Sequence, residues 1–173
     1  NIIPTTLTLS ATLALAGTIH TPGDATLAQK SEPRPIDLAI CLDTSGSMQG
    51  LIEQAKSQLW KICNEFIKAR QDGVAPEVQV ALYEYGKSSL KAETGWIRQI
   101  QPLTQDLDKI SEELFALRTN GGEEYCGWVI KCAVDELAWN PAADVYKAIF
   151  IAGNEPFTQG KVNYAESCKA AIT

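Results

Sequence analysis

Histidine is almost absent from this chain, and its scarcity removes several kinds of catalytic chemistry. Of 173 residues only His20 is a histidine, and it lies close to the amino terminus. Pairs of serine or cysteine with histidine, which activate nucleophiles in many hydrolases, are therefore impossible in the rest of the chain. A glycine-rich phosphate-binding loop is missing as well. These gaps argue against common hydrolase and nucleotide-dependent activities.

Concentrated positive charge is also missing. The 15 lysines and arginines are scattered without two adjacent to one another, and 21 aspartates and glutamates give a net charge of -6. Phosphate binding needs clustered positive charge, so we do not expect nucleic acid as a partner. The negative balance is compatible with binding a cation or a basic protein surface.

The chain also lacks an apolar run long enough to span a bilayer. The longest such run, Leu7–Ile19, has 13 residues and fits the hydrophobic region of a signal peptide, with Ala25 or Ala28 before a cleavage point. Neither an initiating methionine nor a basic segment precedes this run. A disordered N-terminal arm is the alternative to a signal peptide. We predict a leader and proline-containing linker over residues 1–35. The domain at 36–173 is then expected to be exported, as a periplasmic, secreted or cell-envelope protein without a membrane span.

Five cysteines are present, and no pair of them has zinc-type spacing. Cys41 lies in an apolar strand-like run and Cys63 in an amphipathic helical pattern, so both are interpreted as small core residues. Buried free thiols are the prediction. The competing possibility for an exported chain is one disulfide that involves Cys126, Cys132 or Cys168.

From residue 36 onward, strand-like and helix-like segments alternate. Strands are predicted at Ile36–Leu42, Val78–Tyr85, Trp96–Ile100 and Val145–Ala152, and helices at 51–69, Asp106–Leu117, within Tyr125–Trp139 and from about Val162. The first and last strands are apolar enough to be covered on both faces, whereas the third resembles an edge strand. This order predicts an α/β fold, an open, doubly wound, mostly parallel sheet with helices on both faces.

A polar loop, DTSGSM, follows the first predicted strand. Asp43 supplies a carboxylate, Ser45 and Ser47 supply hydroxyls, and Gly46 allows a sharp turn. These hard oxygen donors suit Mg²⁺, Mn²⁺ or Ca²⁺. Capping of the following helix is the alternative, but capping accounts for only one of the three side chains. We therefore interpret the loop as a metal-binding element.

Two further polar loops are expected near the first. In open α/β sheets ligands bind beyond the carboxyl ends of the strands. The segments 120–124 and 153–155 follow other predicted elements at that edge. The sequence therefore predicts that three loops meet at one site.

The segment from Ile36 to Ala171 resembles a von Willebrand factor type A domain, and DTSGSM after an apolar strand is the specific element. The resemblance implies non-catalytic, cation-mediated binding of a protein ligand through a metal-ion-dependent adhesion site. The resemblance is strongest to bacterial exported members of this family. Complete family domains carry further strands after the last helix, so the domain is expected to be truncated at its carboxyl end. An accessory domain that recruits substrate to a metal-inserting or ATP-driven complex is the alternative function.

Two positions depart from the family pattern. Glu123 and Glu124 stand after the paired glycines, where a threonine is usual, and Gly153 stands where an aspartate is usual, followed by Asn154. We hypothesise that the second carboxylate of the site has been relocated. The modified metal site would comprise Asp43, Ser45, Ser47, Glu123 or Glu124, and Asn154.

Several acidic and hydroxyl side chains have further possible roles. Thr119 and Glu155 are candidate ligand-binding residues, although Thr119 precedes the paired glycines and would require a re-threaded loop. Glu123 and Glu124 also suit the start of a helix, where acidic residues favour the dipole. Glu84 alternates with two tyrosines along a strand and is predicted to lie on the surface.

Overall fold

The computed structural model describes residues 32–70 and 73–172, and these contain a sheet of four strands in the order β3-β2-β1-β4. Its strands are β1 (Pro35–Asp43), β2 (Glu77–Tyr85), β3 (Ile97–Thr104) and β4 (Tyr146–Ala152). The central strand β1 pairs in parallel with β2 and β4, and β3 runs antiparallel to β2. The predicted mostly parallel α/β sheet is confirmed, with the third strand at an edge.

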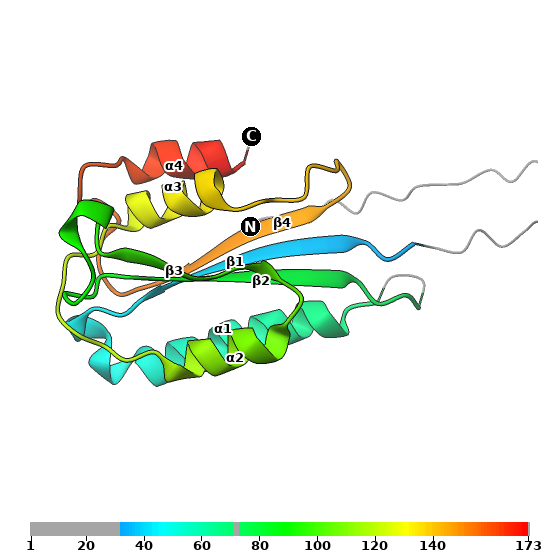
Figure 1. Ribbon diagram of the computed structural model, residues 1–173, viewed down its shortest axis with the longest axis horizontal. Helices are drawn as coiled ribbons and strands as arrows, with labels where there is room; N and C mark the ends of the chain where they lie inside the picture. Colours follow the sequence, from blue (N-terminus) through cyan, green and yellow to red (C-terminus); the bar gives the residue numbers. More distant parts are fainter. Residues whose placement is uncertain (1–31, 71–72, 173) are drawn as a thin grey trace, which may run out of the picture. The chain divides into compact units, whose positions relative to one another are not determined.

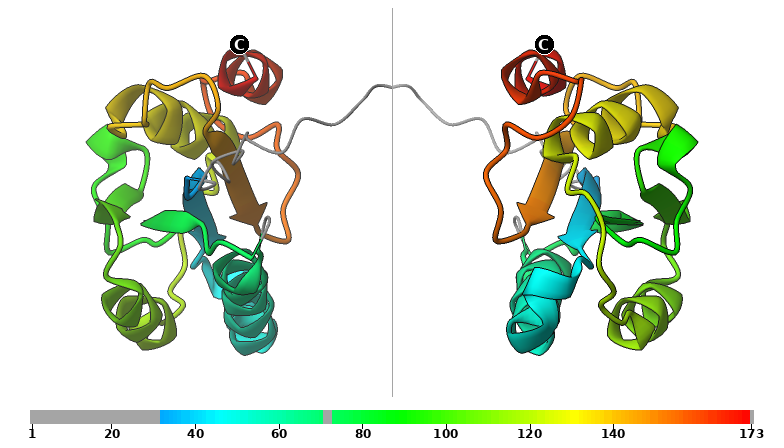
Figure 2. Two further views of the ribbon diagram at one scale, coloured as in Figure 1. Left: turned by 90° about the vertical axis from the view of Figure 1, so that its right-hand side faces the viewer. Right: turned by 90° about the vertical axis from the view of Figure 1, so that its left-hand side faces the viewer.

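Helices cover both faces of this sheet (Figure 1). The helices are α1 (Ile52–Lys68), α2 (Leu107–Ala116), α3 (Cys126–Glu136) and α4 (Tyr164–Ala171), with short 3-10 turns η1 (Gly46–Gly50) and η2 (Ala92–Thr94). The pair α1 and α2 lies on one side, and α3 and α4 lie on the other (Figure 2). Each predicted helix is present, but α1 begins only after η1 and ends at Lys68.

Two apolar clusters fill the spaces between the sheet and its helices. Along β1, Leu38, Ile40 and Leu42 pack towards α1 and α2, whereas Ala39 and Cys41 belong to the cluster that includes α3. Alternate side chains of a strand point to opposite faces, so a strand covered on both faces is apolar throughout. This explains the nearly continuous apolar run that precedes the polar loop.

The structure corrects the expected exposure of two strands. The predicted surface residue Glu84 is completely buried, and so is the rest of β2 from Val80 to Tyr85. Alternate side chains of β2 point to two different layers of helices, and both layers bury them. In contrast, β4 is only half-buried, because within the described residues it pairs with β1 alone.

All five cysteines are free thiols. Cys41 and Cys63 are buried as predicted, and Cys126 is buried as well. Cys132 is half-buried and Cys168 is exposed, so the prediction of buried thiols is wrong for Cys168.

The predicted leader lies almost entirely outside the described residues, which begin at Glu32. The leader and the domain boundary at residue 36 therefore stay predictions. Within the described part of the chain, none of the helices has the length and apolar character needed to cross a membrane.

Candidate functional site

Three loops meet at the carboxyl end of the sheet. The loop after β1 contacts the loop before α3 through the Asn120 amide, which donates to the Thr44 carbonyl oxygen at 2.9 Å. It contacts the loop after β4 through the Ser47 hydroxyl, which donates to Asn154 Oδ1 at 3.0 Å. Because β1 and β4 are parallel neighbours, their polar ends face the same edge. The convergence predicted for these loops is therefore present.

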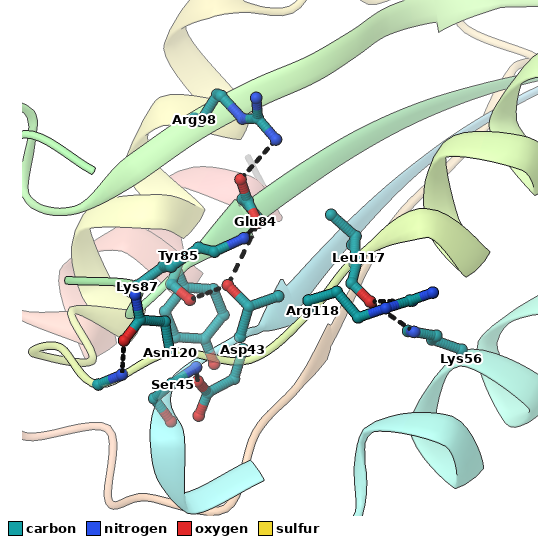
Figure 3. Close-up of polar contacts among 12 residues, drawn as sticks. Asp43, Ser45, Lys56, Glu84, Tyr85, Lys87, Arg98, Leu117, Arg118 and Asn120 are labelled. Carbon is teal, nitrogen blue, oxygen red and sulfur yellow. Dashed lines mark hydrogen bonds and ion pairs between the residues drawn. The ribbon is translucent and has the colours of Figure 1, made fainter. Parts of the chain in front are cut away.

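Asp43 lies at the centre of this arrangement and is completely buried. Its Oδ1 accepts a hydrogen bond from the Ser45 amide at 2.8 Å (Figure 3), whereas Oδ2 accepts none from the described residues. Burial raises the pKa of the Asp43 carboxyl, while hydrogen bonding from Ser45 lowers it. The backbone N–H of Asn154 also lowers this pKa, although it forms no hydrogen bond with Oδ2. A buried carboxylate oxygen without a partner is costly, so a cation beside it would be stabilising.

The two serine hydroxyls lie beside each other and towards Asn154. Ser45 Oγ and Ser47 Oγ are 2.9 Å apart, and the Ser47 hydroxyl donates a hydrogen bond to Asn154 Oδ1. Neither η1 nor α1 receives a side-chain cap from its N-cap residue, Ser45 or Leu51. Helix capping therefore does not account for the hydroxyls, which form a chain of oxygen atoms instead.

Of the two adjacent glutamates, the structure brings Glu124 to the site. Its side chain is nearly buried, and Glu123 is exposed. Burial and then the charge of Asp43 raise the pKa of Glu124, while a hydrogen bond with the Ser45 side chain lowers it. The geometry agrees, because a Cβ atom on Gly86 would lie 3.2 Å from Glu124 Cγ, 2.9 Å from Asp43 Oδ1 and 3.3 Å from Ser45 Cβ. No contact within residues 32–70 and 73–172 joins Glu123 to these side chains.

The two candidate ligand-binding residues, Glu155 and Thr119, also differ in their relation to Asp43. Glu155 is half-buried, and its charge contributes to the raised pKa of both Asp43 and Glu124. It therefore belongs to the electrostatic surroundings of the site. Thr119 is half-buried too, but in the described part of the chain it forms no hydrogen bond with Asp43 or with the two serines.

Two glycines that contact Asp43 were missed as site residues in the sequence. A Cβ atom on Gly153 would lie 2.5 Å from the Tyr85 hydroxyl and 3.0 Å from Asp43 Oδ2. A Cβ on Gly86, whose φ is 82°, would lie 2.9 Å from Asp43 Oδ1. With this backbone, an aspartate at position 153 would require Tyr85 or Asp43 to move. The tight contact gives a physical reason for the departure, and Asn154 is the residue that reaches the serines.

The buried carboxylate of Glu84 supports the same loop from beneath. Thr44, next to Asp43, points its hydroxyl at Glu84 Oε2, 3.3 Å away, and at the Tyr85 carbonyl oxygen, 3.2 Å away. Arg98 and Lys87 form ion pairs with Glu84 at 2.6 and 3.6 Å (Figure 3). Two cations of the protein thus lie beside this single carboxylate.

The donor set decides which metals the site suits. Among the described residues, no three histidine, cysteine, aspartate or glutamate side chains gather closely enough to form a metal cluster by themselves. The candidate donors are instead two carboxylates, two hydroxyls and one amide oxygen. Hard cations such as Mg²⁺, Mn²⁺ and Ca²⁺ accept such mixed oxygen sets. The residues present therefore fit a hard divalent ion.

The sequence profile of the von Willebrand factor type A domain matches residues 38–154. The match spans more than half of the chain, so the chain belongs to this family. A comparison with curated protein sequences found no match.

Solved structures with a similar fold come from proteins of much greater length. Proximal thread matrix protein 1 from the mussel byssus, in crystal form 2, aligns with a TM-score of 0.56 and 14% identity over 81% of this chain and 35% of that one. The same protein with a zinc-occupied MIDAS motif gives 0.51 and 17% over 69% and 28%. The pilus adhesin SpaC from Lactobacillus rhamnosus GG, in an open conformation, gives 0.53 and 16% over 70% and 15%. At these identities the likeness shows the fold.

Proposed function

We propose that this chain is an exported, non-catalytic protein-binding domain whose binding depends on a divalent cation. The carrying observation is the buried Asp43 Oδ2, which has no hydrogen-bond partner among the described residues and lies where three polar loops meet. We assign the cation, Mg²⁺ or else Mn²⁺ or Ca²⁺, to five side chains: Asp43, Ser45, Ser47, Glu124 and Asn154. When bound, such an ion supplies an electrophilic position that an oxygen atom of a protein ligand can fill.

Each assigned side chain has a distinct task. Asp43 provides a fixed charge, because the Ser45 amide holds one of its oxygens. Ser45 and Ser47 provide neutral oxygens that are already oriented by the hydrogen bond to Asn154. Glu124 provides the second carboxylate, in place of one at position 153, where an aspartate would require Tyr85 or Asp43 to move. The site thus keeps two carboxylates with one of them on another loop.

Two of the similar structures support a binding role outside the cell. One is described as a pilus adhesin and the other as a byssus thread matrix protein with a zinc-occupied MIDAS motif. The apolar run of Leu7–Ile19 is the sequence feature that supports export. Together they favour a periplasmic, secreted or envelope-associated adhesion module over an intracellular recruiting domain.

Calorimetric titration of Mg²⁺ and Mn²⁺ into the protein tests this proposal. We expect binding by the wild type, its loss in Asp43→Asn, and a weakening of about tenfold or more in Glu124→Gln, since a charged ligand is removed. The matched control is Glu123→Gln, which changes the same charge one residue away on an exposed side chain and should bind normally. Absence of binding by the wild type contradicts the proposal, and equal binding by both glutamine variants contradicts the assignment of Glu124.

A further inference from the structure

We propose that Lys87 and Arg98 bind an acidic side chain of the protein partner, beside the cation site and without using the cation. We call these two side chains the basic pair. The inference deepens the proposed function and rests on it in one respect, which is that the partner is a protein. It gives that partner a second point of contact at the carboxyl end of the sheet.

The basic pair carries more positive charge than the neighbouring acidic residue neutralises. Arg98 Nη2 lies 2.6 Å from Glu84 Oε1, and Lys87 Nζ lies 3.6 Å from Glu84 Oε2. Both side chains point to this one carboxylate (Figure 3). Among the ion pairs of the described residues, neither cation has a second acidic partner. One positive charge is therefore in excess, and a single carboxylate from outside would neutralise it.

The carboxylate and the two cations differ in their exposure. The Glu84 side chain is 1% exposed, whereas that of Lys87 is 19% and that of Arg98 is 53% exposed. A partner can therefore touch the cations but not the carboxylate between them. The Lys87 ammonium is too far from Glu84 for a hydrogen bond, so its donors are not used there. The exposed guanidinium of Arg98 presents a planar fork of N–H donors that matches a carboxylate.

The basic pair lies at the rim of the three loops that form the cation site. Lys87 follows Gly86, where an added Cβ would lie 2.9 Å from Asp43 Oδ1. On its other side, the Ser88 amide donates a hydrogen bond to the Gly121 carbonyl oxygen. Lys87 is thus held between the loop after β1 and the loop before α3. A partner docked at this edge of the sheet would meet both the cation site and the basic pair.

The charge of the rest of the chain makes this local excess distinctive. The whole chain carries a net charge of -6, so it repels acidic segments at long range. At physiological salt the screening length is about 8 Å, so the local excess acts on a group that is close to the basic pair. Binding of an acidic segment should therefore depend on these two side chains and not on the overall charge of the protein.

Peptide binding in EDTA separates the basic pair from the cation site. A capped, fluorescent tetraglutamate peptide and its neutral counterpart tetraglutamine would each be titrated with the full chain at about 0.15 M salt, with fluorescence anisotropy as the readout. The variants are Lys87→Gln and Arg98→Gln. The matched control is Lys91→Gln, which removes the same charge from an exposed residue four positions further along the chain.

The wild type is expected to bind tetraglutamate more tightly than tetraglutamine. Each substitution in the basic pair should weaken tetraglutamate binding by about threefold to fivefold, as is typical of one exposed charge pair, and should change tetraglutamine binding by less than about twofold. Lys91→Gln should leave both affinities within about twofold, because its charge is screened from the basic pair. A merely structural role for Lys87 and Arg98 would give no difference between the two peptides. If one variant does not fold, the other decides.

Four results would overturn the inference. The first is equal affinity of the wild type for the two peptides, and the second is an effect of Lys91→Gln as large as that of Lys87→Gln. The third is tetraglutamate binding that appears only with Mg²⁺, which would assign the acidic group to the cation and leave the proposed function intact. The fourth is displacement of the peptide by inorganic sulfate at a much lower concentration than by acetate, which would assign the basic pair to a sulfate or phosphate group.

The proposed function fails in a different way. A wild type that binds neither Mg²⁺ nor Mn²⁺, yet binds tetraglutamate through Lys87 and Arg98 in EDTA, would remove the cation site. The contact between the basic pair and an acidic segment would then stand without it.

Discussion

Two carboxylates lie buried at the ends of neighbouring parallel strands, and they differ in their hydrogen-bonding and charged partners. Asp43 ends β1 and Glu84 is the penultimate residue of β2, and both have no exposed surface. In the strand register Asp43 is opposite Tyr85, and Glu84 is opposite Leu42. Since side chains alternate between faces, the two carboxylates point to opposite sides of the sheet.

Glu84 has two charged partners in its own chain. Arg98, Lys87 and the Thr44 hydroxyl all approach it, so its charge is neutralised inside the fold (Figure 3). Among the described residues, Asp43 accepts one hydrogen bond, from the Ser45 amide on Oδ1. A buried charge needs compensation. The difference indicates that Glu84 is a structural group, and it agrees with our proposal that Asp43 binds a cation from solution.

The largest effect is expected from Glu84→Ala. Loss of the carboxylate leaves Thr44 and two cations without their shared partner and opens a cavity at the base of the polar loop. We expect about 3 kcal/mol of lost unfolding free energy, measured by urea denaturation in EDTA. Glu77→Ala, at the exposed start of the same strand, is the control and should change little. A loss below about 1 kcal/mol for Glu84→Ala would contradict the structural role.

The second effect concerns the contact beneath Asp43. Gly153→Ala places a Cβ 2.5 Å from the Tyr85 hydroxyl and 3.0 Å from Asp43 Oδ2, so one of these groups must move. We expect about 2 kcal/mol of destabilisation together with weaker Mn²⁺ binding. The control is Gly50→Ala, because a Cβ at Gly50 meets nothing within 4 Å. Equal stability of the two variants would show that the loop after β4 can shift freely.

Convergence of the loops could be predicted from the sequence, because it depends only on the strand directions. Apolar runs before Asp43 and before Gly153 indicate parallel core strands, and parallel strands bring their carboxyl ends to one edge. The oxygen-rich loop and its family resemblance then predict the kind of site, which stays a prediction. This reasoning needs no side-chain positions.

The burial of Glu84 could not be predicted in this way. Its neighbours Tyr83 and Tyr85 give an alternation typical of a half-exposed strand, yet helices cover both faces. Arg98 approaches through the β2–β3 pairing, whose register contains irregularities. The choice between Glu123 and Glu124, and the crowding at Gly153, depend likewise on contacts between distant segments. Such contacts leave no local sequence pattern.

A smaller change in stability, with a large change in cation response, is expected from Asp43→Asn. The amide keeps an oxygen for the Ser45 hydrogen bond and removes a buried, uncompensated charge. In EDTA the variant should therefore match the wild type within about 1 kcal/mol. Saturating Mg²⁺ should stabilise the wild type by about 2.7 kcal/mol at a hundredfold excess over Kd, and the variant hardly at all. Thermal unfolding with and without Mg²⁺ checks both points. A parallel rise in the variant would place the cation elsewhere.

The smallest effect is expected from Arg98→Gln. The Arg98 side chain is 53% exposed, so solvent and salt screen its ion pair with Glu84, and Lys87 remains beside the same carboxylate. We expect a loss of at most about 1 kcal/mol that shrinks further in high salt. Urea denaturation at low and high ionic strength measures both quantities. A loss as large as that of Glu84→Ala would mean that one arginine neutralises the buried charge alone. A small loss would show that Arg98 and Lys87 share the neutralisation of Glu84, whereas no described ion pair reaches Asp43.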